Sequence, residues 1–232
     1  MRQTLRTWMT ALAYGARRSL RNLALVGTAF LATPALAEVK ILALGDSLTA
    51  GYGLPPEQGF VPRLGAWLAA HGAPDVTVIN AGVSGDTTAG GLARIDWALG
   101  DDPDAVIVEL GANDLLRGLD PGTTRANLDA ILNAIGKRDL PVLLAGVPVP
   151  PNYGEDYRAA FKAIYPDLAD KHGAILYRSF LAGMGKGRNM FEVMQLMQDD
   201  GLHPNAQGVE AIVEDIGPVV LKLVAEAREG AD

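Results

Sequence analysis

A serine, a histidine and an aspartate in this chain have the spacing that nucleophilic catalysis requires. Ser47 lies in Gly-Asp-Ser-Leu, directly after an apolar run and at the start of a helical turn, where its hydroxyl suits a nucleophile and its backbone N–H an oxyanion donor. His203 follows Asp200 by three residues, so the carboxylate can reach one ring nitrogen and leave the other free to accept a proton. Each signal is ambiguous alone: Ser47 fits a helix N-cap equally well, and His203 fits a capping or metal role.

Two further segments offer hydrogen-bond donors for a developing oxyanion. Gly82 lies in Asn-Ala-Gly-Val-Ser-Gly-Asp-Thr, and glycine allows a backbone N–H to approach a ligand closely. Asn113 lies in Gly-Ala-Asn-Asp, and its amide carries two N–H donors. Taken singly, an ordinary turn explains the first segment and an Asx-turn the second. All of these segments follow apolar runs or precede the last helix, and this joint placement predicts one catalytic site.

Metal, cofactor and redox chemistry find little support in the sequence. The chain has no cysteine, which excludes a thiolate metal site, a dithiol and a disulfide framework. His71 and His172 each end a helical pattern before glycine, where a role at the helix C-terminus explains them. A metal site could draw on Asp199, Asp200 and His203, but no second His or Cys lies nearby in sequence to complete the set of metal ligands. We therefore expect neither a metal nor a cofactor.

The elements that must position these residues alternate along the chain. Mostly apolar runs predict five strands, and the amphipathic stretches between them predict helices, with Thr123 or Thr124 as a cap and Pro218 as a kink. This alternation predicts an α/β fold with a parallel sheet covered on both faces, whose functional loops follow the carboxyl ends of the strands. The expected strands span residues 39–44, 76–80, 105–110, 142–147 and 174–177, and the expected helices 57–70, 87–99, 123–137, 156–171 and 205–228.

Residues 1–37 have the composition of a cleavable secretory signal peptide. They contain five arginines and no acidic residue, then an apolar run over 23–31 and the small-x-small sequence Ala35-Leu36-Ala37. Residues 23–37 are too few to span a bilayer, which needs about 20 residues, so we expect no membrane anchor after cleavage. Arg17-Arg18 leaves a twin-arginine export route open. We expect a periplasmic or secreted protein whose residues 38–232 form a single domain.

The acidity of the mature chain argues against nucleic-acid binding. The formal net charge of −7 becomes −12 once a leader with five arginines and no acids is removed. Affinity for phosphate backbones needs clustered Lys and Arg side chains, which this chain lacks.

The four segments together resemble the SGNH (GDSL-type) hydrolase family, which is named for its Ser, Gly, Asn and His. The matching positions are Ser47, Gly82, Asn113 and His203 with its companion Asp200. The resemblance covers nearly the whole of residues 38–232 and implies a serine hydrolase. It further implies a catalytic triad of Ser47, His203 and Asp200, and an oxyanion hole built from the Ser47 and Gly82 N–H groups and the Asn113 amide.

Four segments look like those of the bacterial periplasmic thioesterase I group, whose members combine thioesterase, arylesterase, lysophospholipase and weak protease activities. That likeness implies a three-layer, flavodoxin-like sandwich with a five-stranded parallel sheet in the order 2-1-3-4-5. The chain departs from the group at Ala112, where the family has a second glycine, and this puts the substrate range in doubt. The segments span residues 111–118, 151–154, 163–166 and 197–204.

The expected activity is hydrolysis of small acyl esters or thioesters through an acyl-enzyme. Ala112 and Tyr153 are the expected substrate-binding residues, because Tyr153 lies in a proline-rich segment over 147–157 that follows the fourth strand. A plain connecting loop explains that segment equally well.

Three rival functions are open at this stage: a carbohydrate O-acetylesterase, a non-enzymatic periplasmic binding protein, and a nucleotide-binding flavodoxin-like protein. The low aromatic content weighs against the first, the complete set of site residues against the second, and the missing phosphate loops against the third. The sequence leaves open which acyl chain length is preferred. It also leaves the oligomeric state open, and we expect a monomer.

Overall fold

The computed structural model describes residues 38–230. The predicted leader over residues 1–37, and with it the expected cleavage after Ala37, lies outside the described residues and stays a prediction.

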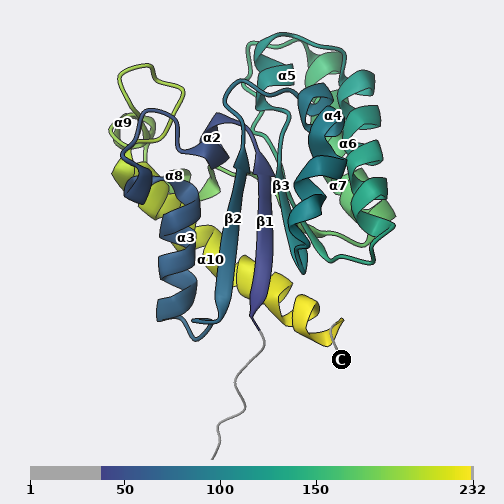
Figure 1. Ribbon diagram of the computed structural model, residues 1–232. Coiled ribbons are helices and arrows are strands. Elements are labelled where there is room, and N and C mark those ends of the chain that lie inside the picture. The colour runs from purple at the N-terminus through teal and green to yellow at the C-terminus, as the bar shows by residue number, and fades with distance from the viewer. Residues whose placement is uncertain (1–37, 231–232) are drawn as a thin grey trace, which may run out of the picture. The chain divides into compact units, whose positions relative to one another are not determined.

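The centre of the fold is a sheet of five parallel strands in the order β2-β1-β3-β4-β5 (Figure 1). This confirms the predicted α/β class and strand order. Most residues of β1, β3 and β4 are apolar, because a parallel sheet covered by helices buries both of its faces. The strands are β1 (Val39–Gly45), β2 (Val76–Gly82), β3 (Ala105–Glu109), β4 (Val142–Ala145) and β5 (Ile175–Tyr177).

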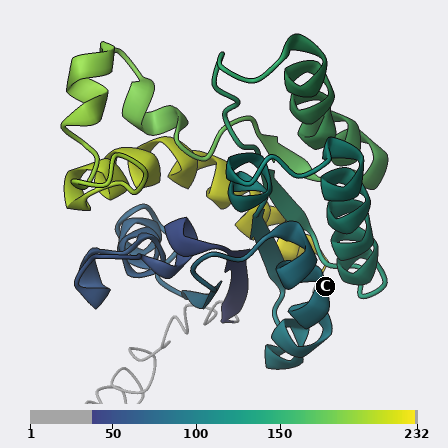
Figure 2. The same ribbon diagram turned by 90° about the horizontal axis from the view of Figure 1, so that it is seen from above.

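Helices cover both faces of the sheet, and alternate residues of each strand face opposite layers (Figures 1 and 2). Ile41, Ala43 and Ile107 pack with α3 (Phe60–Ala70) and α10 (Ala206–Glu229). Leu42 and Leu44 belong to the second core, which packs against the remaining long helices. Those helices are α4 (Thr88–Ala98), α6 (Pro121–Gly136) and α7 (Glu155–His172).

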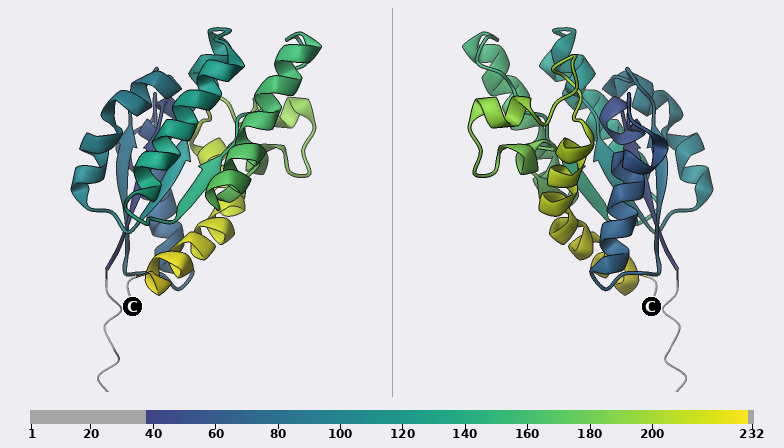
Figure 3. Two further views of the ribbon diagram at one scale, coloured as in Figure 1. Left: turned by 90° about the vertical axis from the view of Figure 1, so that its right-hand side faces the viewer. Right: turned by 90° about the vertical axis from the view of Figure 1, so that its left-hand side faces the viewer.

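The long helix α10 crosses one face of the sheet obliquely, as the two side views in Figure 3 show. It packs closely on α3: a methyl group on Gly217 would lie 2.5 Å from the ring of Trp67. Pro218 lies inside α10, and the helix continues through it. None of the described helices is both long and apolar enough to cross a membrane.

The ends of several elements differ from the sequence prediction. The helix predicted over 123–137 begins at Pro121, and its N-cap is Asp120 rather than Thr123 or Thr124, because proline suits the first helical position and Asp120 accepts from the Thr123 N–H. The fourth strand stops at Ala145, before Pro148. The helical turn expected to start at Ser47 is present as α2 (Ser47–Ala50). Short helices not foreseen from sequence are α5 (Ala112–Leu116), α8 (Ala182–Gly185) and α9 (Met190–Met194), with 3₁₀ turns η1 (Pro56–Gln58) and η2 (Leu99–Asp101).

Candidate active site

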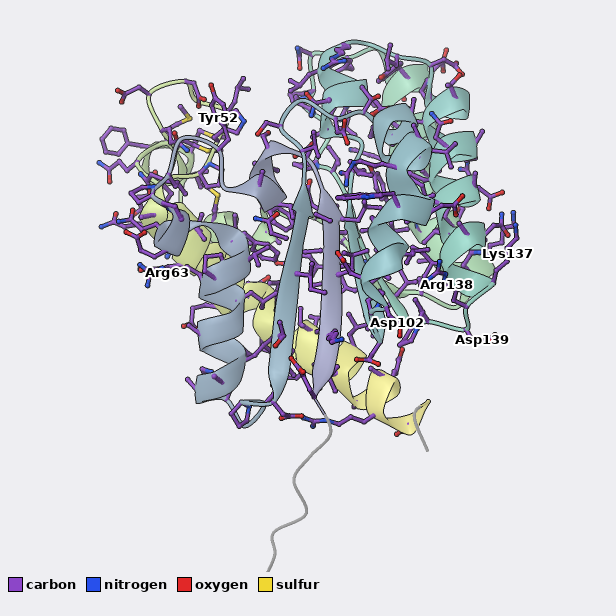
Figure 4. All side chains as sticks on the ribbon, in the orientation of Figure 1. Tyr52, Arg63, Asp102, Lys137, Arg138 and Asp139 are labelled. Carbon is purple, nitrogen blue, oxygen red and sulfur yellow. The ribbon has the colours of Figure 1, made fainter. Side chains whose placement is uncertain are left out.

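The predicted site residues gather at the carboxyl ends of the strands. Ser47 opens α2 just beyond β1, Gly82 ends β2, and Asn113 lies in α5 just beyond β3. In Figure 4, Tyr52 is labelled at the carboxyl end of the strands and Arg138 near their amino end. Parallel strands bring all of their carboxyl ends to one edge, so residues far apart in sequence meet there.

Asp200, His203 and Ser47 form a continuous chain of hydrogen bonds. The Nε2 atom of His203 lies 2.9 Å from the Ser47 Oγ, although 156 residues separate the two in sequence. On the other side of the ring, Nδ1 lies 2.6 Å from the Asp200 Oδ2. One nitrogen of the imidazole therefore meets a carboxylate and the other meets a hydroxyl.

The Asp200 carboxylate is held by the turn that it helps to build. Its Oδ1 accepts the backbone N–H groups of Leu202 at 2.9 Å and His203 at 3.0 Å. These two backbone donors, together with the His203 ring, lower the pKa of Asp200 to about 2, because each favours the charged carboxylate. Asp200 is therefore ionised at every pH at which the protein would normally be studied.

Ser47 is the first residue of α2, and neighbouring residues pack closely against this turn. Asp46 is the N-cap, and its carboxylate accepts the Leu48 N–H at 3.0 Å. Gly82 packs directly against this turn: a Cβ atom there would lie 2.3 Å from the Ala50 nitrogen. Glycine at position 82 is thus required by the close approach of β2 to the turn.

Asn113 reaches the same turn from α5. Its Nδ2 donates to the Asp46 Oδ2 at 3.0 Å, which uses one of the two amide hydrogens and leaves the second available. The neighbouring Asp114 is buried and anchors α5, because it accepts the Thr88 N–H at 2.8 Å and hydroxyls of Thr88 at 2.6 Å and Thr124 at 3.3 Å. The position of Asn113 is therefore fixed both by Asp46 and by the helices beneath it.

The Gly82 N–H has a partner of its own. It donates to the Asn80 side-chain oxygen at 2.9 Å, two residues earlier. Gly82 is thus brought to the Ser47 turn as expected, but its N–H is occupied by a protein acceptor.

An apolar cavity of about 310 Å³ opens beside Ser47 and His203. Tyr153 and Ala112, the two predicted substrate-binding residues, both line it. The Tyr153 hydroxyl donates to the Leu115 carbonyl at 2.8 Å, which joins the proline-rich segment to α5. Other apolar lining residues are Leu48, Leu115, Leu116, Val147, Pro148, Pro150, Phe180, Leu181, Met197 and Leu202.

Several residues of the site were missed by sequence reasoning. The ring of Tyr52 lies 4.6 Å from the His203 ring, centroid to centroid. Gln198 joins the two neighbourhoods by donating to the carbonyls of Tyr52 at 2.8 Å and Pro204 at 3.0 Å. Glu109 is buried beneath Ser47, and a lone acid in an otherwise apolar strand was a signal that could have found it. Tyr52 and Gln198 carry no comparable signal.

Within the described residues, no group of three or more His, Cys, Asp or Glu side chains is arranged to hold a metal ion.

The other two histidines lie at helix ends, as predicted. His71 is the C-cap of α3 and its ring stacks on that of Trp67. His172 is the last residue of α7, and its Nε2 lies 2.6 Å from the Asp129 Oδ1.

A comparison with protein families matches residues 43–211 to the GDSL-like lipase/acylhydrolase family. The matched segment begins in β1, before Ser47, and ends in α10, after His203. The chain belongs to this family. The resemblance drawn from the four sequence segments is thereby confirmed.

Curated relatives carry the same likeness over most of the chain. An arylesterase from Vibrio mimicus is 40% identical over 204 residues, which is 88% of this chain and 98% of that protein. A thioesterase 1/protease 1/lysophospholipase L1 from Escherichia coli strain K12 is 39% identical over 173 residues, covering 74% of this chain and 78% of that protein.

A solved structure agrees with this. The crystal structure of AlinE4, described as an SGNH-hydrolase family esterase, is 45% identical, with a TM-score of 0.65 over 80% of this chain and 96% of that one. Together, the family and these relatives support an ester or thioester hydrolase.

Proposed function

We propose that the chain hydrolyses acyl esters and thioesters with Ser47 as nucleophile, His203 as general base and Asp200 as the group that orients the histidine. The observation that carries the proposal is the hydrogen-bonded chain Asp200–His203–Ser47, with contacts of 2.6 and 2.9 Å. The ionised Asp200 accepts a hydrogen bond from the Nδ1–H group, so Nε2 is the nitrogen left to accept the proton of the Ser47 hydroxyl.

The reaction runs through two acyl-transfer steps. The Ser47 oxygen attacks the acyl carbonyl while its proton moves to His203, and the resulting imidazolium is stabilised by Asp200. His203 then protonates the leaving alcohol or thiol, and an acyl-enzyme remains on Ser47. Water, deprotonated by His203, attacks the acyl-enzyme, and His203 then returns the proton to the Ser47 oxygen as the carboxylic acid is released.

The oxyanion is bound by the Ser47 N–H at the start of α2 and by the second amide hydrogen of Asn113. Asp46 supports the assignment of Asn113, because its 3.0 Å bond to Nδ2 directs the amide toward the Ser47 turn. Gly82 is the third donor of the proposed hole. The Gly82 N–H already donates to Asn80, so it can bind the oxyanion only through a bifurcated hydrogen bond or after it leaves Asn80. It therefore stabilises the oxyanion less than the Ser47 N–H and the Asn113 amide do.

The substrate is an ester or thioester with an apolar acyl chain. The cavity beside Ser47 is bounded by Tyr153 and Ala112 together with Leu, Val, Pro, Phe and Met side chains, which favour hydrocarbon over sugar hydroxyls. The names of the relatives, arylesterase and thioesterase 1/lysophospholipase L1, support the same class of substrates.

Hydrolysis of p-nitrophenyl esters from acetate to palmitate tests this proposal. We expect activity that peaks at medium or long acyl chains and is abolished in Ser47→Ala, whose circular dichroism stays that of the parent. Ser84→Ala is the matched control, because Ser84 is exposed and lies outside the cavity lining. Substantial hydrolysis by Ser47→Ala contradicts the nucleophile, and activity on acetate alone favours the sugar O-acetylesterase.

We propose further that the enzyme acts in the periplasm or outside the cell, as a monomer and without a lasting membrane anchor. The composition of residues 1–37 supports export.

A further inference from the structure

Glu109 is a carboxyl group that forms no salt bridge with any cation in the described part of the chain. It is the last residue of β3, the central strand, and only 1% of its surface is exposed. It pairs in register with Gly45 of β1, two residues before Ser47. Its side chain lines the same cavity as Ser47 and His203. The proposed mechanism assigns it no part.

The contacts of Glu109 are with the Ser47 turn. Its Oε2 accepts the Thr49 hydroxyl at 2.9 Å and, weakly, the Asp46 N–H at 3.4 Å. A Cβ atom on Gly45 would lie 2.8 Å from the same oxygen, so the turn and the carboxyl group are in close contact. The other oxygen, Oε1, has no hydrogen-bond partner among the described residues. Thr49 of α2 and the N-cap residue Asp46 thus both contact one carboxyl group.

The second carboxyl group nearby is Asp46, and the two differ in their donors. Asp46 accepts N–H groups from Leu48 and Asn113, which favour its charged form. Burial, and then the charge of Asp46, raise the pKa of Glu109 well above its ordinary value; burial raises that of Asp46 as well. The two N–H donors to Asp46 and the deeper burial of Glu109 therefore both favour a negative charge on Asp46 over one on Glu109.

The other ionisable groups around the pair do not neutralise Glu109. His203 faces Asp46, and Tyr165 donates its hydroxyl to the Leu110 carbonyl. Arg94 is bound by Asp86 at 2.7 Å and by the Gly45 carbonyl at 3.0 Å. A buried carboxylate without a cation is costly, and a neutral acid avoids this cost.

We infer that Glu109 is a positioning residue held as a neutral carboxylic acid, which supports the Ser47 turn through Thr49 and leaves Asp46 with the one negative charge that orients the Asn113 amide. The role in catalysis rests on the proposed function, whereas the protonation of Glu109 does not. If Glu109 ionised, a second negative charge would lie beside Asp46, close to the site where the oxyanion forms, and would oppose it. kcat should therefore fall at alkaline pH as Glu109 loses its proton.

Two variants separate the neutral acid from a merely space-filling side chain. Glu109→Gln keeps the shape and stays uncharged, so kcat at neutral pH should remain within about threefold of the parent and the alkaline loss due to Glu109 should disappear. Glu109→Ala removes the support of the turn and should lower kcat by roughly 10-fold or more while KM changes little. Glu226→Gln, on the exposed face of α10, is the matched control.

Thr49→Val tests the same contact from its other side and covers the case in which Glu109→Ala fails to fold. The Thr49 hydroxyl favours the ionised form of Glu109, so its loss should move the alkaline fall in kcat to higher pH. Unchanged pH profiles in both Thr49→Val and Glu109→Gln would overturn the positioning role.

Infrared spectroscopy of the free enzyme measures the proton directly. The spectrum of the parent at neutral pH should contain a C=O band of a protonated carboxylic acid that is missing in Glu109→Gln and present in Glu226→Gln. An identical band in the parent and Glu109→Gln would show that Glu109 is ionised and would overturn the inference. Since this measurement needs no substrate, it is decided separately from the esterase mechanism.

Discussion

His203 has a different partner on each ring nitrogen, and this division determines what each nitrogen can do. The 2.6 Å contact of Nδ1 with Asp200 leaves Nε2, at 2.9 Å from Ser47, as the proton acceptor. Asp200 in turn accepts hydrogen bonds from two N–H groups of its own turn, so the orientation of the carboxylate does not depend on a distant element.

Asn113→Ala tests the oxyanion hole. Loss of the amide should lower kcat roughly 10²–10³-fold with little change in KM, because the donor acts mainly on the charge that develops in the transition state. Steady-state kinetics on one p-nitrophenyl ester give both constants, and Asn133→Ala, an exposed helical asparagine of α6, is the control. An unchanged kcat would remove Asn113 from the hole.

Asp200→Asn tests the carboxylate through the pH dependence of stability. A pKa lowered from 3.8 to about 2 means that Asp200 stabilises the fold above pH 4, and that this contribution is lost as pH falls toward 2. The difference in Tm between the parent and Asp200→Asn should therefore narrow over that interval. Thermal melts by circular dichroism measure it; a constant difference would mean that the pKa of Asp200 is not lowered.

The residues of the site were predictable from sequence to the extent that their types are chemically distinctive. Ser47, His203 and Asp200 were candidates because a hydroxyl, an imidazole and a carboxylate stood beside expected strand or helix ends, and the structure brings the three side chains into contact. Asp46 and Glu109 were passed over, since their roles depend on a contact between neighbouring strands that sequence spacing does not reveal.

At the level of elements, Gly217 of α10 and Gly65 of α3 allow a paired test of how closely the two helices pack. Gly217→Ala should destabilise the fold by about 1–3 kcal/mol, because the new methyl would meet the Trp67 ring. Gly65→Ala should stabilise it by about 0.5–1 kcal/mol, since the methyl would enter open space and alanine favours the helix. Thermal melts should show Tm shifts of opposite sign, about 2–4 °C per kcal/mol.

A raised Tm in Gly217→Ala as well as in Gly65→Ala would mean that α10 does not pack on α3 as closely as described. Either result can be separated from effects on catalysis, because neither glycine lines the cavity beside Ser47.

The predicted elements match the structure where the segment was long enough for a repeating apolar pattern to be recognised. β1, β3 and the long helices were located to within a few residues, because a buried strand or an amphipathic helix leaves a repeating pattern. The helices α2, α5, α8 and α9 have only four or five residues each, too few to show a period. Two of these, α2 and α5, carry Ser47 and Asn113, so the site depends most on elements that sequence patterns predict least.

For the whole molecule, the proposed export leads to one direct prediction. When the complete chain is produced in a bacterial host that secretes proteins, N-terminal sequencing of the exported protein should begin at Glu38. The same chain without residues 1–37 should stay inside the cell and keep its esterase activity. A mature protein that starts well away from Glu38, or one retained in the membrane, would contradict the predicted leader.

The separation of Ser47 from His203 by 156 residues has a consequence for the order in which the enzyme is made. A ribosome releases the first strand and its serine long before the loop that carries the histidine and the helix α10 that follows it. Under the proposed mechanism, the Ser47 hydroxyl of a growing chain therefore meets its general base only after almost all of the chain has been synthesised. Hydrolysis of acyl esters by this mechanism begins only once the His203 loop has folded against Ser47.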